Sequence, residues 1–390
     1  SRAVELLPEK DAARLDVLPD LGLALYEAGD YSAAIDVFEE AISLATMLDD
    51  ARTATRCRIF KERARIHRDA QVNTEELRGV ADRAVEILGS AGDDYGLAYA
   101  WDLSAYVHEC AGRSTDALAA FRRAATHAER SGVPSLIGYQ RRALVRSLAW
   151  GQGHVSEIIP LAEELLEWGR GVGDRYSQAR ALLTLAQSHA MLGQFDVAHQ
   201  YVDLQEDVCA DVSFEFVHAS GAFERAQVQL LGGNVPAATA EARRGCETLQ
   251  RIGEKAVLPT LQVQLADLAY MQGDAELARD LIQRARSLSA QDDSLTEMKW
   301  RSVMAKVLAK CGDVDEAQDL ADEAVSIASA TGYLDWQAGV LVDVGEVMAR
   351  SGRNEEARNA LRRARELYRQ KGNIVSQRAI EDRLSEKPAV

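Results

Sequence analysis

Histidine and cysteine are the residues of this chain best suited to metal binding or nucleophilic chemistry, and their spacing favours neither role. No H-E-x-x-H sequence occurs, and none of the five cysteines belongs to a C-x-x-C pair. His189 and His199 are too far apart in sequence to share one helix face as a ligand pair. We interpret the histidines as packed, hydrogen-bonded side chains and the cysteines as small core residues of a reduced protein.

The remaining motifs also argue against an enzyme. The glycine-rich stretch 169–173 joins two predicted helices, whereas a phosphate-binding loop follows a strand. Adjacent aspartates at 49–50, 93–94 and 292–293 precede predicted helices, where the helix dipole favours them more than a metal would. We therefore expect no catalytic residues, no metal and no cofactor. The enzyme alternative would require Asp102, His108, Glu109 and Arg141 to converge. 

Composition limits the partners. The net charge of −16 and the sequence pI near 5.0 argue against a general affinity for nucleic acid or anionic lipid. No apolar run is long enough to span a membrane and no signal peptide opens the chain, so we expect a cytoplasmic protein. The chain begins with Ser1, and residues 3–8 resemble the tail of a helix, which suggests a region of a longer polypeptide.

The stretch 18–41 defines the element that positions everything else. Leu18 and Leu25 fall on one predicted helix, a break follows at Gly29-Asp30, and Phe38 falls on a second helix that folds back on the first. Small residues stand where the two helices would cross. Such a hairpin cannot bury its apolar side alone, so it must be repeated.

The turn recurs at a fixed spacing. Glycines 29, 112, 193, 233, 273, 312 and 352 are separated by 83, 81, 40, 40, 39 and 40 residues, so the period is about 40 and the first two steps each hide a weaker repeat. We predict a single domain over 1–390 with nine helical pairs and a capping helix. The predicted pairs are 11–48, 51–88, 94–130, 135–168, 174–209, 213–250, 254–289, 293–330 and 333–370, with the cap at 373–385.

These positions resemble the tetratricopeptide repeat. In the first pair, the signature positions hold Leu18, Leu21, Gly22, Leu25, Gly29, Tyr31, Ala34, Phe38 and Ala41. The unit is longer than the usual length of about 34 residues. Long units are similar to those of sensor regions in bacterial signalling ATPases and ATPase-coupled adenylate cyclases. The resemblance implies an all-α right-handed superhelix that binds a protein or peptide, with ATPase or cyclase domains attached at its N-terminus.

In this family the first helix of each pair lines the concave groove, which gives a set of candidate partner-binding residues. Rings provide contact area and polar groups fix the register of an extended peptide, although an ordinary solvated surface is an equal alternative at each position. Counted back from each turn, the candidates are Tyr99, Asp102, Tyr106, Glu109, Arg180, Gln187, Phe223, Gln227, Asp267, Tyr270, Lys299 and Lys306.

The expected mechanism is mechanical. If each pair contacts only its neighbours, a ligand that grips several pairs changes the pitch of the array, and an attached domain senses the change. The predicted function is therefore a non-catalytic interaction and sensing region of a bacterial signalling or transcription-regulatory protein. One alternative is a stand-alone receptor that binds a small peptide or metabolite in the groove, and the other is an enzyme on a helical-repeat scaffold.

Overall fold

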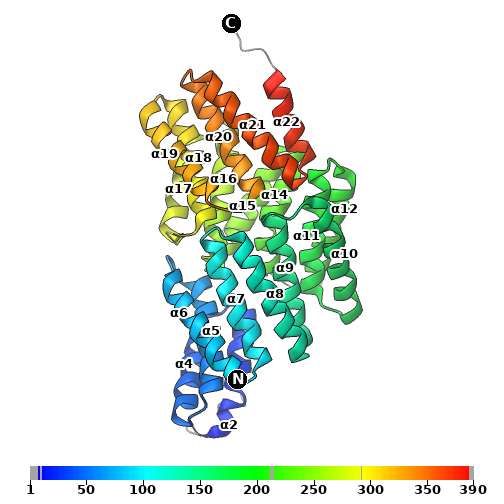
Figure 1. Ribbon diagram of the computed structural model, residues 1–390, viewed down its shortest axis with the longest axis vertical. Helices are drawn as coiled ribbons and strands as arrows, with labels where there is room; N and C mark the ends of the chain where they lie inside the picture. Colours follow the sequence, from blue (N-terminus) through cyan, green and yellow to red (C-terminus); the bar gives the residue numbers. More distant parts are fainter. Residues whose placement is uncertain (1–7, 9–10, 211–214, 291, 386–390) are drawn as a thin grey trace.

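The protein is all-α, as the sequence predicts. The computed structural model describes residues 8, 11–210, 215–290 and 292–385, and every regular element in these ranges is a helix (Figure 1). Residues 3–7 and the predicted start of the sixth pair at 213 lie outside them. None of the helices in these ranges combines the length and the apolar character that a membrane crossing requires.

The helices follow one another as nine antiparallel pairs within the described residues, preceded by the short α2 (Ala12–Leu15) and closed by α22 (Ile374–Ser385). Two short helices together form the first half of the sixth pair. The pairs are α3 (Leu18–Glu27) and α4 (Tyr31–Met47), α5 (Ala51–Arg68) and α6 (Thr74–Ser90), α7 (Asp94–Cys110) and α8 (Ser114–Ser131), α9 (Pro134–Trp150) and α10 (Val155–Val172), α11 (Arg175–Met191) and α12 (Phe195–Ala210), α13 (Glu215–Ser220) with α14 (Ala222–Leu231) and α15 (Val235–Arg251), α16 (Leu258–Met271) and α17 (Ala275–Leu288), α18 (Ser294–Cys311) and α19 (Val314–Ser329), and α20 (Leu334–Arg350) and α21 (Asn354–Lys371).

The first pair shows why the hairpin forms. A Cβ atom on Gly22 would lie 2.3 Å from Cε1 of Phe38, so only glycine lets this ring reach the helix crossing. Phe38 is fully buried there, where truncation to alanine typically costs about 3–5 kcal/mol. Gly29 ends α3 at a φ of 81°, and the Asp30 side chain accepts a hydrogen bond from Ala33 N–H to start α4.

The paired aspartates act as helix caps, as their position predicts. Asp50, Asp93 and Asp293 each accept a hydrogen bond from the main-chain N–H three residues later. The other aspartate of the third pair, Asp292, accepts a hydrogen bond from Thr74 in the second helical pair. One aspartate of each pair therefore caps the start of a helix.

The expectation that each pair contacts only its neighbours is wrong. His67 Nδ1 lies 2.9 Å from Glu254 Oε1, and Gly332 N–H donates to the Gly112 carbonyl over 3.1 Å. Figure 1 shows the corresponding arrangement, in which α6 and α7 lie beside the α16–α18 region. The small rotation at each pair accumulates until the chain meets itself about five pairs later, so consecutive superhelical turns touch.

We call this contact the seam. Lys371 is the most buried cation of the seam. The Lys371 side chain is fully buried, and its Nζ donates to the carbonyls of Leu148, Ala149 and Gly151 at the end of α9. The seam consists of residues 67–74, 109–114 and 148–154 on one side and of residues 254–256, 288, 292, 331–333 and 371–372 on the other.

Candidate functional site

The first helices of successive pairs form the inner wall of the superhelix. Helix α9 packs against α11, α16 against α18, and α18 against α20, so the first helices are closely spaced from pair to pair. Close spacing of one helix set is expected on the concave side of a curved array. The sequence-predicted candidates all lie on these helices.

The N-terminal part of the wall holds a tyrosine cage around Arg63. The guanidinium carbon of this residue lies 5.3, 4.9 and 4.6 Å from the ring centres of Tyr26, Tyr99 and Tyr139. Arg63 is 7% exposed, and its only carboxylate partner among the described residues is Asp102, with Nε 3.6 Å from Oδ2. Tyr139 donates to the same carboxylate over 3.1 Å. Burial raises the pKa of Asp102, against the lowering effect of Arg63.

A second charge pair follows on α7 and α9. Glu109 Oε2 lies 2.8 Å from Arg146, and the Glu109 carbonyl accepts a hydrogen bond from the Tyr333 hydroxyl across the seam. Burial raises the pKa of the Glu109 carboxyl, and Arg146 opposes this shift. Tyr106, one turn earlier, is half-buried, and burial raises its pKa. These residues join the inner wall to the seam.

In the middle of the wall, aromatic rings from distant pairs meet. The Phe223 ring stacks on Trp336 with centroids 5.2 Å apart and lies 5.8 Å from the Trp150 ring. These rings come from α14, α20 and α9, so the sixth, ninth and fourth pairs are in contact here. Beside them, Arg180 pairs with Glu224 over 2.6 Å.

The C-terminal part of the wall holds a lysine–aspartate quartet, formed by Lys299, Lys306, Asp267 and Asp343. Lys306 Nζ pairs with Asp267 and lies 2.7 Å from Asp343 Oδ1, while Lys299 Nζ lies 3.0 Å from Asp343 Oδ2. Burial opposes ionisation of Asp343, but the two lysines outweigh it and lower the pKa of Asp343. Tyr270 lies beneath Lys306, with the ammonium 5.0 Å from its ring centre.

Three family models, each described as a tetratricopeptide repeat, match residues 20–46, 259–284 and 295–370. The chain contains tetratricopeptide repeats. No curated protein matches the sequence. The resemblance read from the turn glycines and the small residues at the helix crossings is therefore confirmed at the level of the repeat.

Solved structures share the fold along nearly the whole chain. A Rap protein complexed with competence and sporulation factor has a TM-score of 0.67 at 12% identity, covering 96% of this chain and 99% of its own. The apo form of the quorum sensor NprR from B. thuringiensis has a TM-score of 0.52 at 13% identity, covering 91% and 99%. Aspartyl phosphate phosphatase F from Bacillus subtilis has a TM-score of 0.52 at 10% identity, covering 92% and 94%. At these identities the likeness shows the fold alone.

The twelve predicted residues divide into groups in this fold. Asp267, Tyr270, Lys299 and Lys306 come together around the quartet. Tyr99 and Asp102 belong to the cage, and Tyr106 and Glu109 lie near the seam. Phe223 belongs to the ring cluster, and Arg180 pairs with Glu224 beside it. Gln187 is buried, and Gln227 is half-buried.

Several wall residues were missed from the sequence, although a signal for some was present. Counting back 13, 10 and 6 residues from Gln152 gives Tyr139, Arg142 and Arg146, the same offsets that gave Tyr99, Asp102 and Tyr106 from Gly112. The predicted set contains no residue from the fourth pair, although that pair was itself predicted at 135–168. The other missed partners are Tyr26, Arg63, Trp150, Glu224, Trp336 and Asp343.

The constellation required by the enzyme alternative does not assemble. Asp102 is bound to Arg63 and Tyr139, and Glu109 is bound to Arg146. His108 accepts from Arg113, and Arg141 pairs with Glu129. Because each of the four residues has a different partner, no shared reacting position is formed by them. No cluster of metal-binding side chains occurs within the described ranges.

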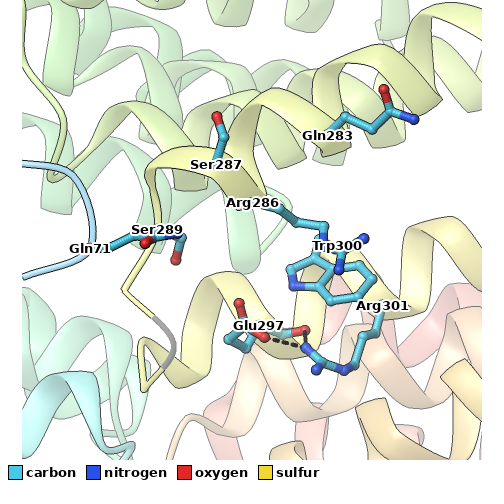
Figure 2. Close-up of a pocket in the computed structure, with 8 residues that line it drawn as sticks. All are labelled: Gln71, Gln283, Arg286, Ser287, Ser289, Glu297, Trp300 and Arg301. Carbon is cyan, nitrogen blue, oxygen red and sulfur yellow. Dashed lines mark hydrogen bonds and ion pairs between the residues drawn. The ribbon is translucent and has the colours of Figure 1, made fainter.

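Two cavities in the described part of the molecule lie away from these candidates. The larger has a volume of about 620 Å³ and is bounded by α17, α18 and the loop before α6 (Figure 2). The other, about 450 Å³, lies between α19, α20 and α21, with Leu341, Arg363 and Leu367 among its lining residues. None of the twelve predicted residues lines either cavity.

Proposed function

We propose that this tetratricopeptide-repeat protein is a non-catalytic receptor that holds a short peptide against the inner wall of its superhelix. The observation that carries the proposal is the row of partly exposed charges on that wall: the Arg180, Lys299 and Asp267 side chains are 17%, 15% and 22% exposed. Rings lie beside these charges, which suits an extended peptide with polar and apolar side chains.

The wall charges are already ordered, and this lowers the cost of binding. Lys299 lies 3.6 Å from Asp267 and 3.0 Å from Asp343, so its ammonium is held in place before a ligand arrives. A peptide carboxylate that reaches Lys299 exchanges one ionic partner for another and leaves Asp343 paired with Lys306. Preorganised groups lose little side-chain entropy on binding, so more of the contact energy appears as affinity.

The solved structures support the same proposal. The Rap structure is described as complexed with competence and sporulation factor, and NprR is described as a quorum sensor. Both matches cover almost the full length of those chains. They favour the receptor alternative of the sequence interpretation over a region that serves only within a larger protein. Attached ATPase or cyclase domains, an extended segment of a partner protein as ligand, and a cytoplasmic location stay predictions.

The seam gives such a receptor a way to respond. The rings of Trp150, Trp336 and Phe223 are in contact, so a peptide that enters beside this ring cluster separates helices from the fourth, sixth and ninth pairs. Because the fourth and ninth pairs are also joined through Lys371, separation of the rings strains the seam. Peptide binding is therefore coupled to the pitch of the superhelix.

The proposal is tested by selecting short random peptides displayed on phage against the immobilised chain, then measuring the dissociation constant of the selected peptide. Lys299→Gln is expected to weaken binding about tenfold, because a charge-assisted hydrogen bond contributes about 1.5–3 kcal/mol. Gln227→Ala is expected to weaken it less. Lys299 and Gln227 are chosen over Tyr270 because Tyr270 is only 6% exposed and supports the fold.

The matched control is Arg243→Gln, which removes a charge from an exposed position of α15 on a second helix. It should leave both affinity and melting temperature unchanged. If no peptide is selected, or if selected peptides bind the Lys299→Gln and Gln227→Ala variants as tightly as the native chain, the inner wall is not the binding site.

A further inference from the structure

The larger cavity lies away from the inner-wall candidates. Gln283, Arg286, Ser287 and Ser289 line it from α17 and the residue after it, and Glu297, Trp300 and Arg301 line it from α18. Gln71 comes from the second pair, on the other side of the seam. Its volume of about 620 Å³ lies within the range of small-ligand sites.

Gln71 is held at this position by the seam. Its main-chain N–H donates to the Leu288 carbonyl over 3.1 Å, and its φ of 54° lies in the left-handed region. Glutamine enters that region at a cost on the order of 1–3 kcal/mol, which the surrounding contacts must offset. The Gln71 side of the cavity therefore depends on the two superhelical turns being in contact.

Trp300 organises the charges of the cavity. The guanidinium carbons of Arg286 and Arg301 lie 4.2 and 4.3 Å from its ring centre, and Figure 2 shows both side chains against the indole. Arg301 also pairs with Glu297 and with Glu323, so its charge is balanced. Arg286 has no carboxylate within ion-pair distance among the described residues, so its charge is available to a ligand.

The polar groups of the cavity lining that lack a partner are mostly hydrogen-bond donors. Trp300 is 4% exposed, and its indole N–H has no hydrogen-bond partner in the described structure. Arg286 adds an unpaired guanidinium, and the amides of Gln71 and Gln283 add donors and acceptors. A guanidinium in this setting recognises a planar anion through two parallel hydrogen bonds.

The negative charge around the cavity favours a singly charged anion over a doubly charged one. Glu297 lies in the cavity wall, and the whole chain carries a net charge of −16, so a doubly charged phosphate would be repelled more strongly than a carboxylate. The Glu297 side chain and the glutamine oxygens can accept hydrogen bonds from N–H groups of the same ligand. This set of groups fits a carboxylate with a nearby amide or amine.

We infer that this cavity is a second binding site, separate from the inner wall, for a carboxylate carried by a peptide C-terminus or by a free amino acid. Arg286 holds the carboxylate, and Gln71 contacts the same ligand from the opposite superhelical turn. A bound ligand therefore bridges the second and seventh pairs. Because Gln71 reaches the cavity only while the turns touch, a ligand that contacts it stabilises the closed seam.

The test is nitrogen-15 NMR of the intact chain, which follows the indole N–H signals of the five tryptophans. Trp300→Phe assigns the Trp300 signal by its loss. Four probes are titrated separately. They are a mixture of N-acetylated tripeptides with free carboxyl ends, the same mixture with amidated ends, a mixture of free amino acids, and inorganic phosphate.

The expected result is a shift of the Trp300 signal with the free-carboxyl tripeptides, with the amino acids or with both, which identifies the source of the carboxylate. Arg286→Gln should weaken this response at least about tenfold, since it removes the charged donor. Arg284→Gln is the matched control, because Arg284 is exposed on the same helix, pairs with Asp280 and does not line the cavity.

Four outcomes would overturn the inference: no shift with any carboxylate probe, an equal shift with the amidated tripeptides, a response to phosphate alone, or an undiminished response in Arg286→Gln. Arg286→Gln separates this site from the inner wall, because Arg286 lines the cavity and Lys299, which precedes Trp300 on α18, does not. A failure here leaves the proposed receptor function standing, and failure of the phage selection leaves this site standing.

Discussion

The tyrosine cage and the lysine–aspartate quartet bury cations at opposite ends of the same inner wall by different means. Arg63 is 7% exposed and faces three rings and one carboxylate, whereas Lys306 is 4% exposed and faces two carboxylates and one ring. A planar, weakly hydrated guanidinium can exchange water for aromatic faces. A compact ammonium is more strongly hydrated and needs full charges in return.

The pKa shifts of the aspartates also differ between the cage and the quartet. Burial raises the pKa of Asp102 in the cage, where its arginine partner lies 3.6 Å away. The two lysines lower the pKa of Asp343 in the quartet, where both lie within 3.0 Å. The comparison indicates that the cage depends mainly on ring packing and the quartet mainly on charge balance.

The largest loss of unfolding free energy is expected from Asp343→Ala. It leaves Lys299 and Lys306 with one carboxylate between them, and breaking a buried ion pair in this way costs about 3–5 kcal/mol. Urea unfolding followed by circular dichroism measures the loss. Asp319→Ala, at an exposed position of α19, should change the unfolding free energy by less than about 0.5 kcal/mol. Equal effects of the two substitutions would contradict the charge-balance account.

Low pH should reduce the loss of unfolding free energy caused by Asp343→Ala. The folded-state pKa of Asp343 lies below its unfolded value, so its stabilising contribution is complete above the unfolded pKa and is lost as pH falls through the folded pKa. The difference in unfolding free energy between native protein and variant should therefore shrink in acid. A difference that grows in acid would mean that the carboxylate is not ionised in the fold.

A smaller loss, about 2 kcal/mol, is expected from Arg63→Lys. The charge is kept, but the planar contact with Tyr26, Tyr99 and Tyr139 is lost, and each such contact contributes about 0.5–1 kcal/mol or more. Arg58→Lys, at an exposed position of α5, is the control and should be neutral. If Arg63→Lys is also neutral in thermal and urea unfolding, charge alone stabilises the cage.

Lys371 sharpens the comparison because its ammonium donates to carbonyl oxygens at the end of α9 and not to carboxylates. Lys371→Met should cost about 1–2 kcal/mol, because these hydrogen bonds across the seam are lost. Gln370→Met, at the exposed neighbouring position, should be neutral. If Lys371→Met unfolds with native stability, the seam does not depend on this cation.

The pH dependence of Lys371→Met provides a second measurement. Burial lowers the pKa of Lys371 from 10.5 to about 8. Between these values the unfolded chain binds the proton and the folded chain does not, so the native protein should gain stability as pH rises from about 8 to 10.5. The Lys371→Met variant should lack this gain. Parallel pH profiles for the two proteins would place Lys371 outside the buried seam.

Much of the fold follows from local sequence. The turn glycines fix the ends of the helices, as Gly29 does at a φ of 81°, and residues such as Phe38 fix the buried stripe. The site is only partly predictable in the same way. A fixed offset from each turn finds Lys306 and Asp267, but not that they pair with Asp343 or that Phe223 meets a tryptophan from the ninth pair. Those partners depend on how adjacent pairs rotate.

The sequence by itself determined the period, the helical pairs and the helix of each pair that carries the candidate residues, because each depends on interactions within about 40 residues. Only the tertiary structure decided that His67 reaches Glu254, that Lys371 caps α9 and that Gln71 completes a cavity with α17 and α18. Small rotations between neighbouring pairs add up over five pairs, so contact between superhelical turns is set by their sum and not by any one repeat.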